Sequence, residues 1–181
     1  MKISETSLPG VLLLTPTIYR DNRGAFFETW NQKQFEDAGL ATSWVQDNCS
    51  YSMKNVVRGI HYQIVQPQAK LVRATGGVVL DVAVDLRRSS PNFGRHVAAE
   101  LRAAEGQMLY IPAGFGHGFV ALSEDVGLAY KVTDYYNPSG ERTIAWNDPA
   151  IGIHWPVSAV AAIVSEKDRK GCRLGDAEVF A

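Results

Sequence analysis

Several features are scarce in this sequence, and each scarcity argues against a class of protein. The only cysteines, Cys49 and Cys172, are far apart, so neither a disulfide framework nor a zinc site of paired cysteines is indicated. No apolar run approaches the roughly 18 residues of a membrane span. Eighteen basic and 19 acidic side chains give a net charge of −1. This balance argues against bulk binding to nucleic acid or anionic membranes, where a basic excess supplies the attraction.

The N-terminus also lacks a targeting pattern. Residues Met1 to Gly10 do not show the basic and then apolar order of a secretory signal. The chain has 181 residues, 46% of them apolar, which is enough for one well-packed core, and it contains no internal repeat, low-complexity tract or linker. We therefore expect one domain spanning residues 1–181, located in the reducing cytoplasm.

The middle of the chain has the alternation of β-strands. Every second residue from Val78 to Leu86 is apolar, while the opposite parity carries Asp81 and Asp85, which predicts a strand with one face in a core. Further extended segments are expected over 11–14, 25–30, 93–101, 107–112, 118–122 and 128–136, separated by Gly, Pro, Ser and Asp clusters. Many short strands at intervals of about ten residues favour a sandwich or barrel.

Helices are few and short in this interpretation. Asn31 is a suitable N-cap, with Gln34 three residues later and Gly39 beyond the end, so a short helix is expected between them. A second helical turn is expected to start at Ser165, where acidic residues suit the N-terminal dipole.

Two histidines lie in distinctive surroundings. The stretch Arg58-Gly59-Ile60-His61-Tyr62-Gln63 has apolar residues on both sides, which suggests a strand that presents a cation and an imidazole, the side chain best suited to proton transfer near neutral pH. The spacing of Gly106, Pro112, Gly114 and His117 resembles the second motif of the cupin superfamily. This resemblance implies a mainly β fold, a cupin-type double-stranded β-helix or jelly-roll barrel with a few short helices.

Many cupins bind a metal through His-x-His, a Glu and a later His. The counterpart here is His61-Tyr62-Gln63, which offers one imidazole, and no Glu follows four residues later. With His117 this makes two candidate ligands, fewer than the three or four protein groups of such sites. We expect no metal and no other cofactor, and structural or surface roles for His96 and His154.

Nine sequence blocks, in order, closely resemble the dTDP-4-dehydrorhamnose 3,5-epimerase family over nearly the whole chain. They are Arg23-Gly24-x-Phe26-x-Glu28, Gln46-Asp47-Asn48, residues 58–63, Gln68 to Arg73, Asp81 to Arg87, Ile111 to Phe119, Tyr130-Lys131, Trp146-Asn147-Asp148-Pro149 with Trp155-Pro156, and Ser165 to Asp168. The resemblance implies cofactor-independent epimerisation at C3 and C5 of dTDP-4-dehydro-6-deoxy-D-glucose, giving dTDP-4-dehydro-L-rhamnose for polysaccharide or metabolite glycosylation.

Inverting a carbon next to a ketone requires removing its proton, holding the enolate and reprotonating from the opposite face. By resemblance, His61 is the general base, Asp168 the carboxylate that pairs with it, Tyr130 the general acid, and Lys70 the cation near the C4 oxygen. From pattern alone other interpretations stay open: Tyr130 as a core aromatic residue, Asp168 as a first-turn helix residue, and Lys70 as a solvated edge charge. Asp81 is a second, lower-ranked partner for His61.

The resemblance also implies a substrate-binding set that holds the nucleotide. It comprises Arg23, Phe26, Glu28, Gln46, Asp47, Asn48, Arg58, His117, Tyr136, Glu141 and Lys167, with Tyr136 stacking on the thymine base unless the register favours Tyr135. Arg23, Arg58 and Lys70 offer cations to the pyrophosphate. The family forms homodimers in which N-terminal strands cross between subunits, so Arg23 and Glu28 are candidates for the neighbour's site.

Two departures from the family pattern are visible: Cys49 where relatives often have His, and Gly116 where they often have Ala. Neither belongs to the acid–base set, and a buried cysteine used as a small hydrophobic residue is the simpler interpretation of Cys49. The alternatives that remain are a single-carbon epimerase acting on a related nucleotide sugar, a metal-dependent cupin enzyme and a non-catalytic nucleotide-sugar binder.

Overall fold

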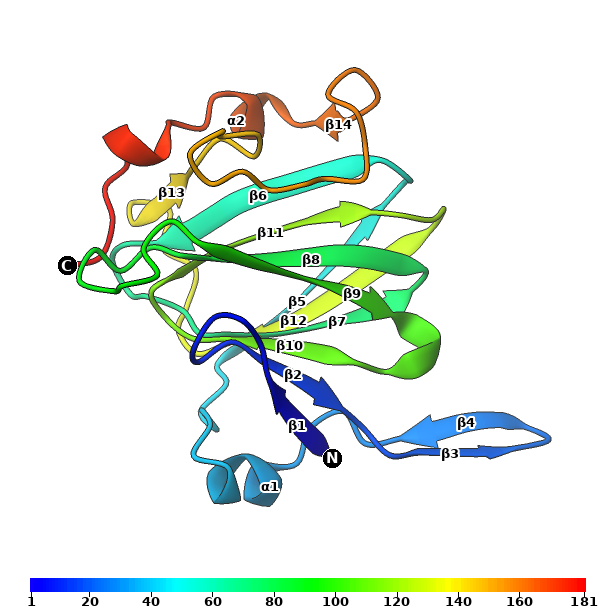
Figure 1. Ribbon diagram of the computed structural model, residues 1–181. Coiled ribbons are helices and arrows are strands. Elements are labelled where there is room, and N and C mark those ends of the chain that lie inside the picture. The colour runs from blue at the N-terminus through cyan, green and yellow to red at the C-terminus, as the bar shows by residue number, and fades with distance from the viewer.

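The computed structural model describes residues 1–181 and contains two antiparallel sheets that face each other (Figure 1). The strands of the first sheet are, in spatial order, β1 (Lys2–Glu5), β2 (Leu12–Thr15), β10 (Met108–Ile111), β7 (Lys70–Gly76), β12 (Val126–Val132) and β5 (Gln46–Ser52). Those of the second are β13 (Glu141–Thr143), β6 (Val56–Gln63), β11 (Phe115–Ala121), β8 (Val78–Asp85) and β9 (His96–Arg102), with β14 (Ile163–Val164) pairing in parallel with β6. The expected mainly β, jelly-roll fold is confirmed.

The space between the sheets is apolar over much of its length. Fourteen buried residues from both sheets and the N-terminal segment form this core, among them Val72 and Leu128 of the first sheet and Val79 and Phe119 of the second. Burying such side chains between two sheets is the main driving force for a fold of this kind, at about 25 cal/mol per Å² of apolar surface. The remaining interior carries polar side chains.

The outer face of the second sheet is also buried, which corrects the one-faced interpretation of residues 78–86. Val82 and Val84 pack there against Trp146, Trp155 and Leu174 of the C-terminal segment. The opposite parity is also fully buried from Val79 to Asp85, including Asp81 and Asp85. The apolar parity therefore marks the face under the C-terminal segment, and the parity that looked polar faces the interior of the barrel.

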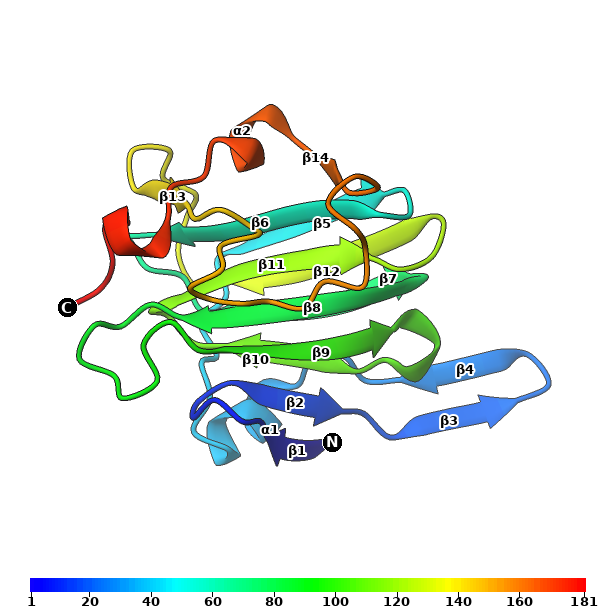
Figure 2. The same ribbon diagram turned by 45° about the horizontal axis from the view of Figure 1, so that its top comes forward.

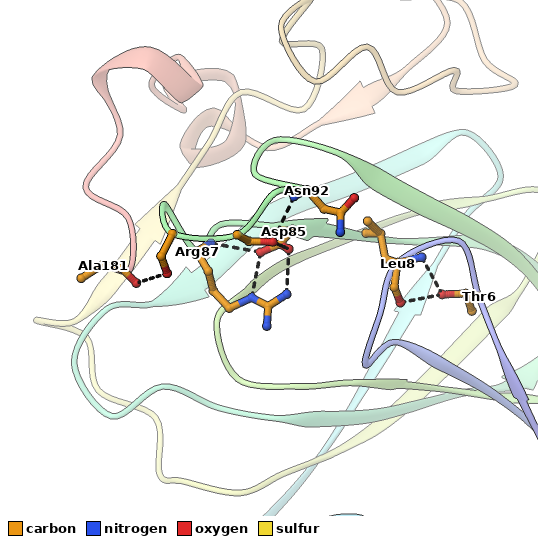
Figure 3. A network of polar contacts seen from close by, with 8 residues as sticks. Thr6, Leu8, Asp85, Arg87, Asn92 and Ala181 are labelled. Atoms are coloured by element: carbon orange, nitrogen blue, oxygen red, sulfur yellow. Dashed lines mark hydrogen bonds and ion pairs between the residues drawn. The ribbon is translucent and has the colours of Figure 1, made fainter.

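Polar contacts fasten the chain beyond β8. The Arg87 guanidinium donates two hydrogen bonds to the buried Asp85 carboxylate, at 2.9 Å (Nε–Oδ1) and 2.7 Å (Nη2–Oδ2), and Figure 3 shows the two groups facing each other. Ser90 Oγ donates a further bond of 2.7 Å to the same carboxylate. Ser89 Oγ donates to the Ala181 carbonyl oxygen at 3.2 Å, which ties the C-terminus to this corner (Figure 3).

Both expected helices are present. Asn31 Oδ1 accepts a hydrogen bond from the Gln34 N–H at 3.2 Å and caps α1 (Gln32–Asp37), whose Phe35 is buried against the outer face of the first sheet. Ser165 Oγ accepts from the Asp168 N–H at 3.1 Å and caps α2 (Glu166–Arg169). Two 3₁₀ turns, η1 (Ala103–Glu105) and η2 (Leu174–Asp176), complete the set. None of these helices is long and apolar enough to cross a membrane.

A two-stranded hairpin, β3 (Ile18–Asp21) and β4 (Gly24–Phe27), projects from the body in both views (Figures 1 and 2). The extended segment expected over 25–30 ends at Phe27, and Asn31 caps α1 four residues later. The bounds of two other strands also differ from those expected. Strand β9 begins at His96 rather than at Phe93, which lies in a turn. Strand β12 runs from Val126 to Val132 rather than over 128–136.

Candidate active site

A cavity of about 350 Å³ lies between the two sheets at their polar end. Its lining comes from β5, β6, β7, β11, β12, β13 and the segments beside them, so both sheets contribute. Nine residues that the sequence assigns to catalysis or substrate binding line it: Gln46, Asn48, Arg58, His61, Lys70, His117, Tyr130, Tyr136 and Glu141. Residues far apart in the chain therefore meet in one concave, polar site, which is the usual form of an enzyme active site.

His61 and Asp168 form a hydrogen-bonded pair at the wall of the cavity. His61 Nε2 lies 2.5 Å from Asp168 Oδ1, and the imidazole is partly exposed whereas the carboxylate is buried. Asp168 is carried there by α2, whose Ser165 cap fixes the start of the helix. The structure thus pairs His61 with Asp168, the higher-ranked of its two candidate partners.

The surroundings of Asp168 keep its carboxyl group ionised. Burial alone would raise its pKa, but hydrogen bonds from His61, the Gly59 N–H and Ser165 outweigh burial, and the net pKa is lowered. An ionised carboxylate only accepts hydrogen bonds, so His61 Nε2 carries a proton. In the neutral imidazole Nδ1 is then unprotonated and is the ring nitrogen available as a base.

A second histidine–carboxylate pair lies deeper in the barrel. His117 Nε2 is 2.8 Å from Asp81 Oδ1, and both side chains are buried. Burial lowers the pKa of His117 despite the nearby Asp81, which acts in the opposite direction, so this imidazole is neutral at pH 7. His117 was expected among the nucleotide contacts; the structure places it in the cavity and against Asp81.

Tyr130 and Lys70 face the same cavity from the first sheet, opposite His61. Burial raises the pKa of the Tyr130 phenol, with Arg58 opposing, so the group is a protonated donor at neutral pH. Lys70 is buried at the start of β7, which rules out the solvated-edge interpretation, and burial lowers its pKa to about 8, with Asp81 and Glu141 opposing. Its ammonium group forms no ion pair or hydrogen bond within the chain and is free to meet a ligand.

A small polar cluster of Gln46, Tyr136, Glu141 and Lys167, here called the mouth cluster, lies at the mouth of the cavity. The Tyr136 hydroxyl donates to Glu141 Oε2 at 2.9 Å, and Lys167 Nζ lies 2.5 Å from Glu141 Oε1. The Tyr136 N–H donates to Gln46 Oε1 at 3.2 Å. Tyr136, rather than its neighbour Tyr135, lines the cavity, so the structure places the expected residue of the two at the site.

Four predicted residues lie away from this cavity in the single chain. Arg23, Phe26 and Glu28 belong to the projecting hairpin or its base: Arg23 pairs with Asp21 and lies 86% exposed, and Phe26 is 73% exposed. Asp47 was expected beside Gln46 and Asn48 but faces the opposite side of β5, since alternate residues of a strand point to opposite faces. Its carboxylate pairs there with Lys131 at 2.9 Å.

Sequence reasoning assigned no role to six further lining residues: Ser50, Tyr62, Gln63, Gln68, Gly118 and Phe119. Strand parity contains a signal for some of them, because Gln63 shares the inward parity of His61, and Ser50 that of Gln46 and Asn48. Ser50 Oγ is buried without a hydrogen-bond partner in the chain. No group of three or more His, Cys, Asp or Glu side chains is arranged to hold a metal ion.

The fold and site together define a cupin-type barrel whose interior carries two histidine–carboxylate pairs, a tyrosine and a buried lysine. The model of the dTDP-4-dehydrorhamnose 3,5-epimerase family matches residues 5–176, and the chain belongs to this family.

Named relatives agree over nearly the full length. The chain is 52% identical to the dTDP-4-dehydrorhamnose 3,5-epimerase of Pseudomonas aeruginosa over 181 residues (99% of each chain). It is 50% identical to that of Salmonella typhimurium over 170 residues (93% and 92%). The crystal structure of dTDP-6-deoxy-D-glucose-3,5-epimerase from Legionella pneumophila, in complex with dTDP-4-keto-L-rhamnose, superposes with a TM-score of 0.94 at 41% identity, covering 98% of this chain and 94% of that one.

Proposed function

We propose that this protein epimerises dTDP-4-dehydro-6-deoxy-D-glucose at C3 and C5 to dTDP-4-dehydro-L-rhamnose, without metal or nicotinamide. One observation carries the mechanism: His61 and Tyr130 line a single cavity from facing sheets. A planar enolate bound between them presents one face to the imidazole and the other to the phenol. Inversion requires this arrangement, because a single group acting on one face would return the proton to the side from which it came.

The proposed reaction proceeds through two proton transfers at each carbon. His61 Nδ1 removes the proton from the carbon next to the ketone, and the electron pair of the C–H bond moves to the carbonyl oxygen. Lys70 stabilises the oxygen charge that develops, an effect worth the most in the transition state. Tyr130 then donates its proton to the carbon from the other face as the enolate electron pair forms the new C–H bond and the ketone is restored. Solvent removes the extra proton from His61 and returns a proton to Tyr130 before the second carbon reacts.

The mouth cluster fits the nucleotide end of the substrate. Tyr136 presents an exposed ring suited to stacking on a base, and Arg58 offers a cation inside the cavity for phosphate oxygens. Gln46, Asn48 and Glu141 supply further polar contacts, and Lys167 holds Glu141 in place.

Proton exchange is the test of this function. The protein is incubated with dTDP-4-dehydro-6-deoxyglucose in D₂O and the C3 and C5 positions are followed by NMR, with and without a chelator. Deuterium at both carbons, unaffected by chelation, supports the proposal. Exchange at one carbon identifies a single-carbon epimerase, loss on chelation a metal enzyme, and tight binding without exchange a nucleotide-sugar binder. His61→Asn should lose about 10²- to 10⁴-fold in exchange while still binding dTDP.

We further propose that the chain forms a homodimer in which each projecting hairpin completes the partner's site. The hairpin exposes Tyr19 and Phe26, at 65% and 73%, and carries Arg23 away from its own cavity. Large exposed aromatic side chains on a projecting strand pair suit an interface between chains. Arg23, Phe26 and Glu28 then contact substrate in the neighbouring subunit.

Subunit mixing tests this arrangement. His61→Asn and Arg23→Ala homodimers are each expected to be poorly active at low substrate concentration. If the hairpin acts in the partner's site, a mixed dimer contains one site with both defects and one site with neither, so mixing restores activity. If Arg23 serves its own chain, every site in the mixture keeps one defect, and no activity returns.

The single domain of residues 1–181 and the cytoplasmic location stay predictions. The two cysteines are both free, which suits a reducing compartment. Both are also exposed, so the interpretation of Cys49 as a buried small hydrophobic residue is wrong.

A further inference from the structure

Asp81 is a buried carboxylate with one oxygen that has no hydrogen-bond partner. It lies on β8 with its side chain fully buried in the barrel interior. Oδ1 accepts a hydrogen bond of 2.8 Å from His117 Nε2, whereas Oδ2 is buried and has no hydrogen-bond partner. An unpaired buried carboxylate oxygen is costly, so a compensating positive charge in the same interior is expected.

Lys70 is the cation that meets this requirement. It faces the interior from β7 of the opposite sheet, and its buried ammonium has no ion-pair partner. Burial lowers the pKa of Lys70 to about 8. Two negative charges oppose this effect and raise the pKa, Asp81 more than Glu141. Without Asp81 the amine would lose its proton closer to neutral pH, and a neutral amine cannot stabilise an enolate.

His117 orients Asp81 without neutralising it. Burial lowers the pKa of His117, so the imidazole is uncharged at pH 7 while its Nε2–H holds Oδ1. The negative charge of the carboxylate is thereby left to act on Lys70. The other titratable groups that line the cavity with Lys70 are Glu141, His61, Tyr62, Tyr130, Tyr136 and the Arg58 guanidinium.

We propose that Asp81 is a positioning residue: its carboxylate, held by His117, is the fixed counter-charge of the Lys70 ammonium across the cavity. This inference rests on the proposed epimerase function for its catalytic meaning, but the coupling between the two residues exists without substrate. Asp81 acts through Lys70 and does not itself exchange protons with the sugar.

The first measurement needs no substrate. Pulse acetylation with acetic anhydride over pH 6–10, followed by mass spectrometry, gives the pH at which half of Lys70 reacts as the free amine. Asp81→Asn keeps the size of the side chain and can still accept the hydrogen bond from His117. This variant should lower the Lys70 midpoint by about one unit, whereas Asp81→Glu, which keeps the charge, should leave it near the wild-type value.

The second measurement is the pH profile of kcat/KM, which reports the free enzyme. Its alkaline limb should move to lower pH in Asp81→Asn, so the loss of activity grows as the pH rises. A merely structural role would lower activity equally at every pH. An unchanged Lys70 midpoint in Asp81→Asn, or a lowered one in Asp81→Glu, overturns the inference. Failure of the wild-type protein to exchange substrate protons overturns the proposed function and leaves the labelling result standing.

Discussion

Replacing Asp168 with Asn tests whether the Asp168 carboxylate sets the tautomer of His61 and stabilises its imidazolium form. Asp168 Oδ1 lies 2.5 Å from His61 Nε2, and Asp168 Oδ2 accepts a hydrogen bond of 3.4 Å from the Gly59 N–H. The amide has one acceptor oxygen where the carboxylate has two. If its oxygen faces His61, the imidazolium that forms during proton abstraction loses its negative partner. If its NH₂ faces His61, Nε2 must accept, the proton moves to Nδ1, and the base is in the wrong tautomer.

The size of the loss follows from this geometry. A hydrogen bond to a charged group contributes about 1.5–3 kcal/mol, which corresponds to about 10- to 150-fold in rate at about 1.4 kcal/mol per tenfold. The wrong tautomer would add to this loss, so at least a tenfold fall in kcat is expected for Asp168→Asn. The affinity for dTDP should change little, because Asp168 lies behind His61 and does not line the cavity.

The assay is deuterium exchange at C5 under saturating substrate, with dTDP affinity measured by calorimetry. Glu166→Gln is the matched control: it lies on the same short helix, its side chain is 93% exposed, and its only ion pair is a 3.9 Å contact with Lys170. The control should retain wild-type exchange. Wild-type kcat in Asp168→Asn would refute the assignment of Asp168 as the partner that sets the His61 tautomer.

Two further predictions concern stability. Gly116→Ala places a methyl group 2.5 Å from Ile60 Cγ2, so overpacking should cost about 1–3 kcal/mol of stability and lower the Tm by several degrees. The control variant Gly175→Ala, whose methyl group meets no atom within 4 Å, should keep the wild-type Tm. Equal melting temperatures for the two variants would show that the core accommodates the methyl group at position 116. Arg87→Met leaves the buried Asp85 carboxylate without its cation and should cost about 3 kcal/mol at pH 7. In the wild type, hydrogen bonds from Arg87 outweigh burial and lower the pKa of Asp85, so this carboxylate contributes stability above its unfolded pKa that is lost as the pH falls through the folded value. In the variant burial dominates and raises that pKa, so the difference in urea unfolding free energy should narrow from pH 7 towards pH 4; a constant difference would contradict this origin.

The sequence predicted the kinds of element well and their surroundings less well. The caps of both helices follow from local chemistry, because Asn31 and Ser165 bond to backbone N–H groups three residues away. The alternation in 78–86 correctly predicted a strand but not its environment. That both faces are buried depends on Trp146 and Trp155, more than 60 positions further along, and alternation within one strand carries no information about what covers it.

The site shows the same limit. Gln46 and Asn48 line the cavity and Asp47 does not, a result that strand parity predicts once residues 46–52 are known to form an edge strand of the barrel. Residue resemblance alone treats the three as one block. In the proposed homodimer the hairpin residues act in the partner's site, and no pattern within one sequence shows where a partner's cavity lies.

The two-sheet architecture accounts for the division of chemical roles. The first sheet contributes Tyr130 and Lys70, and the second contributes His61 and Asp81. Groups on one strand pair lie on one side of a bound sugar, so only facing sheets can direct a base and an acid at opposite faces of the same carbon. The same opposition places Lys70 and Asp81, the pair proposed to interact, on different sheets. In the proposed mechanism, proton abstraction, charge stabilisation and reprotonation therefore depend on how the two sheets face each other rather than on any single motif.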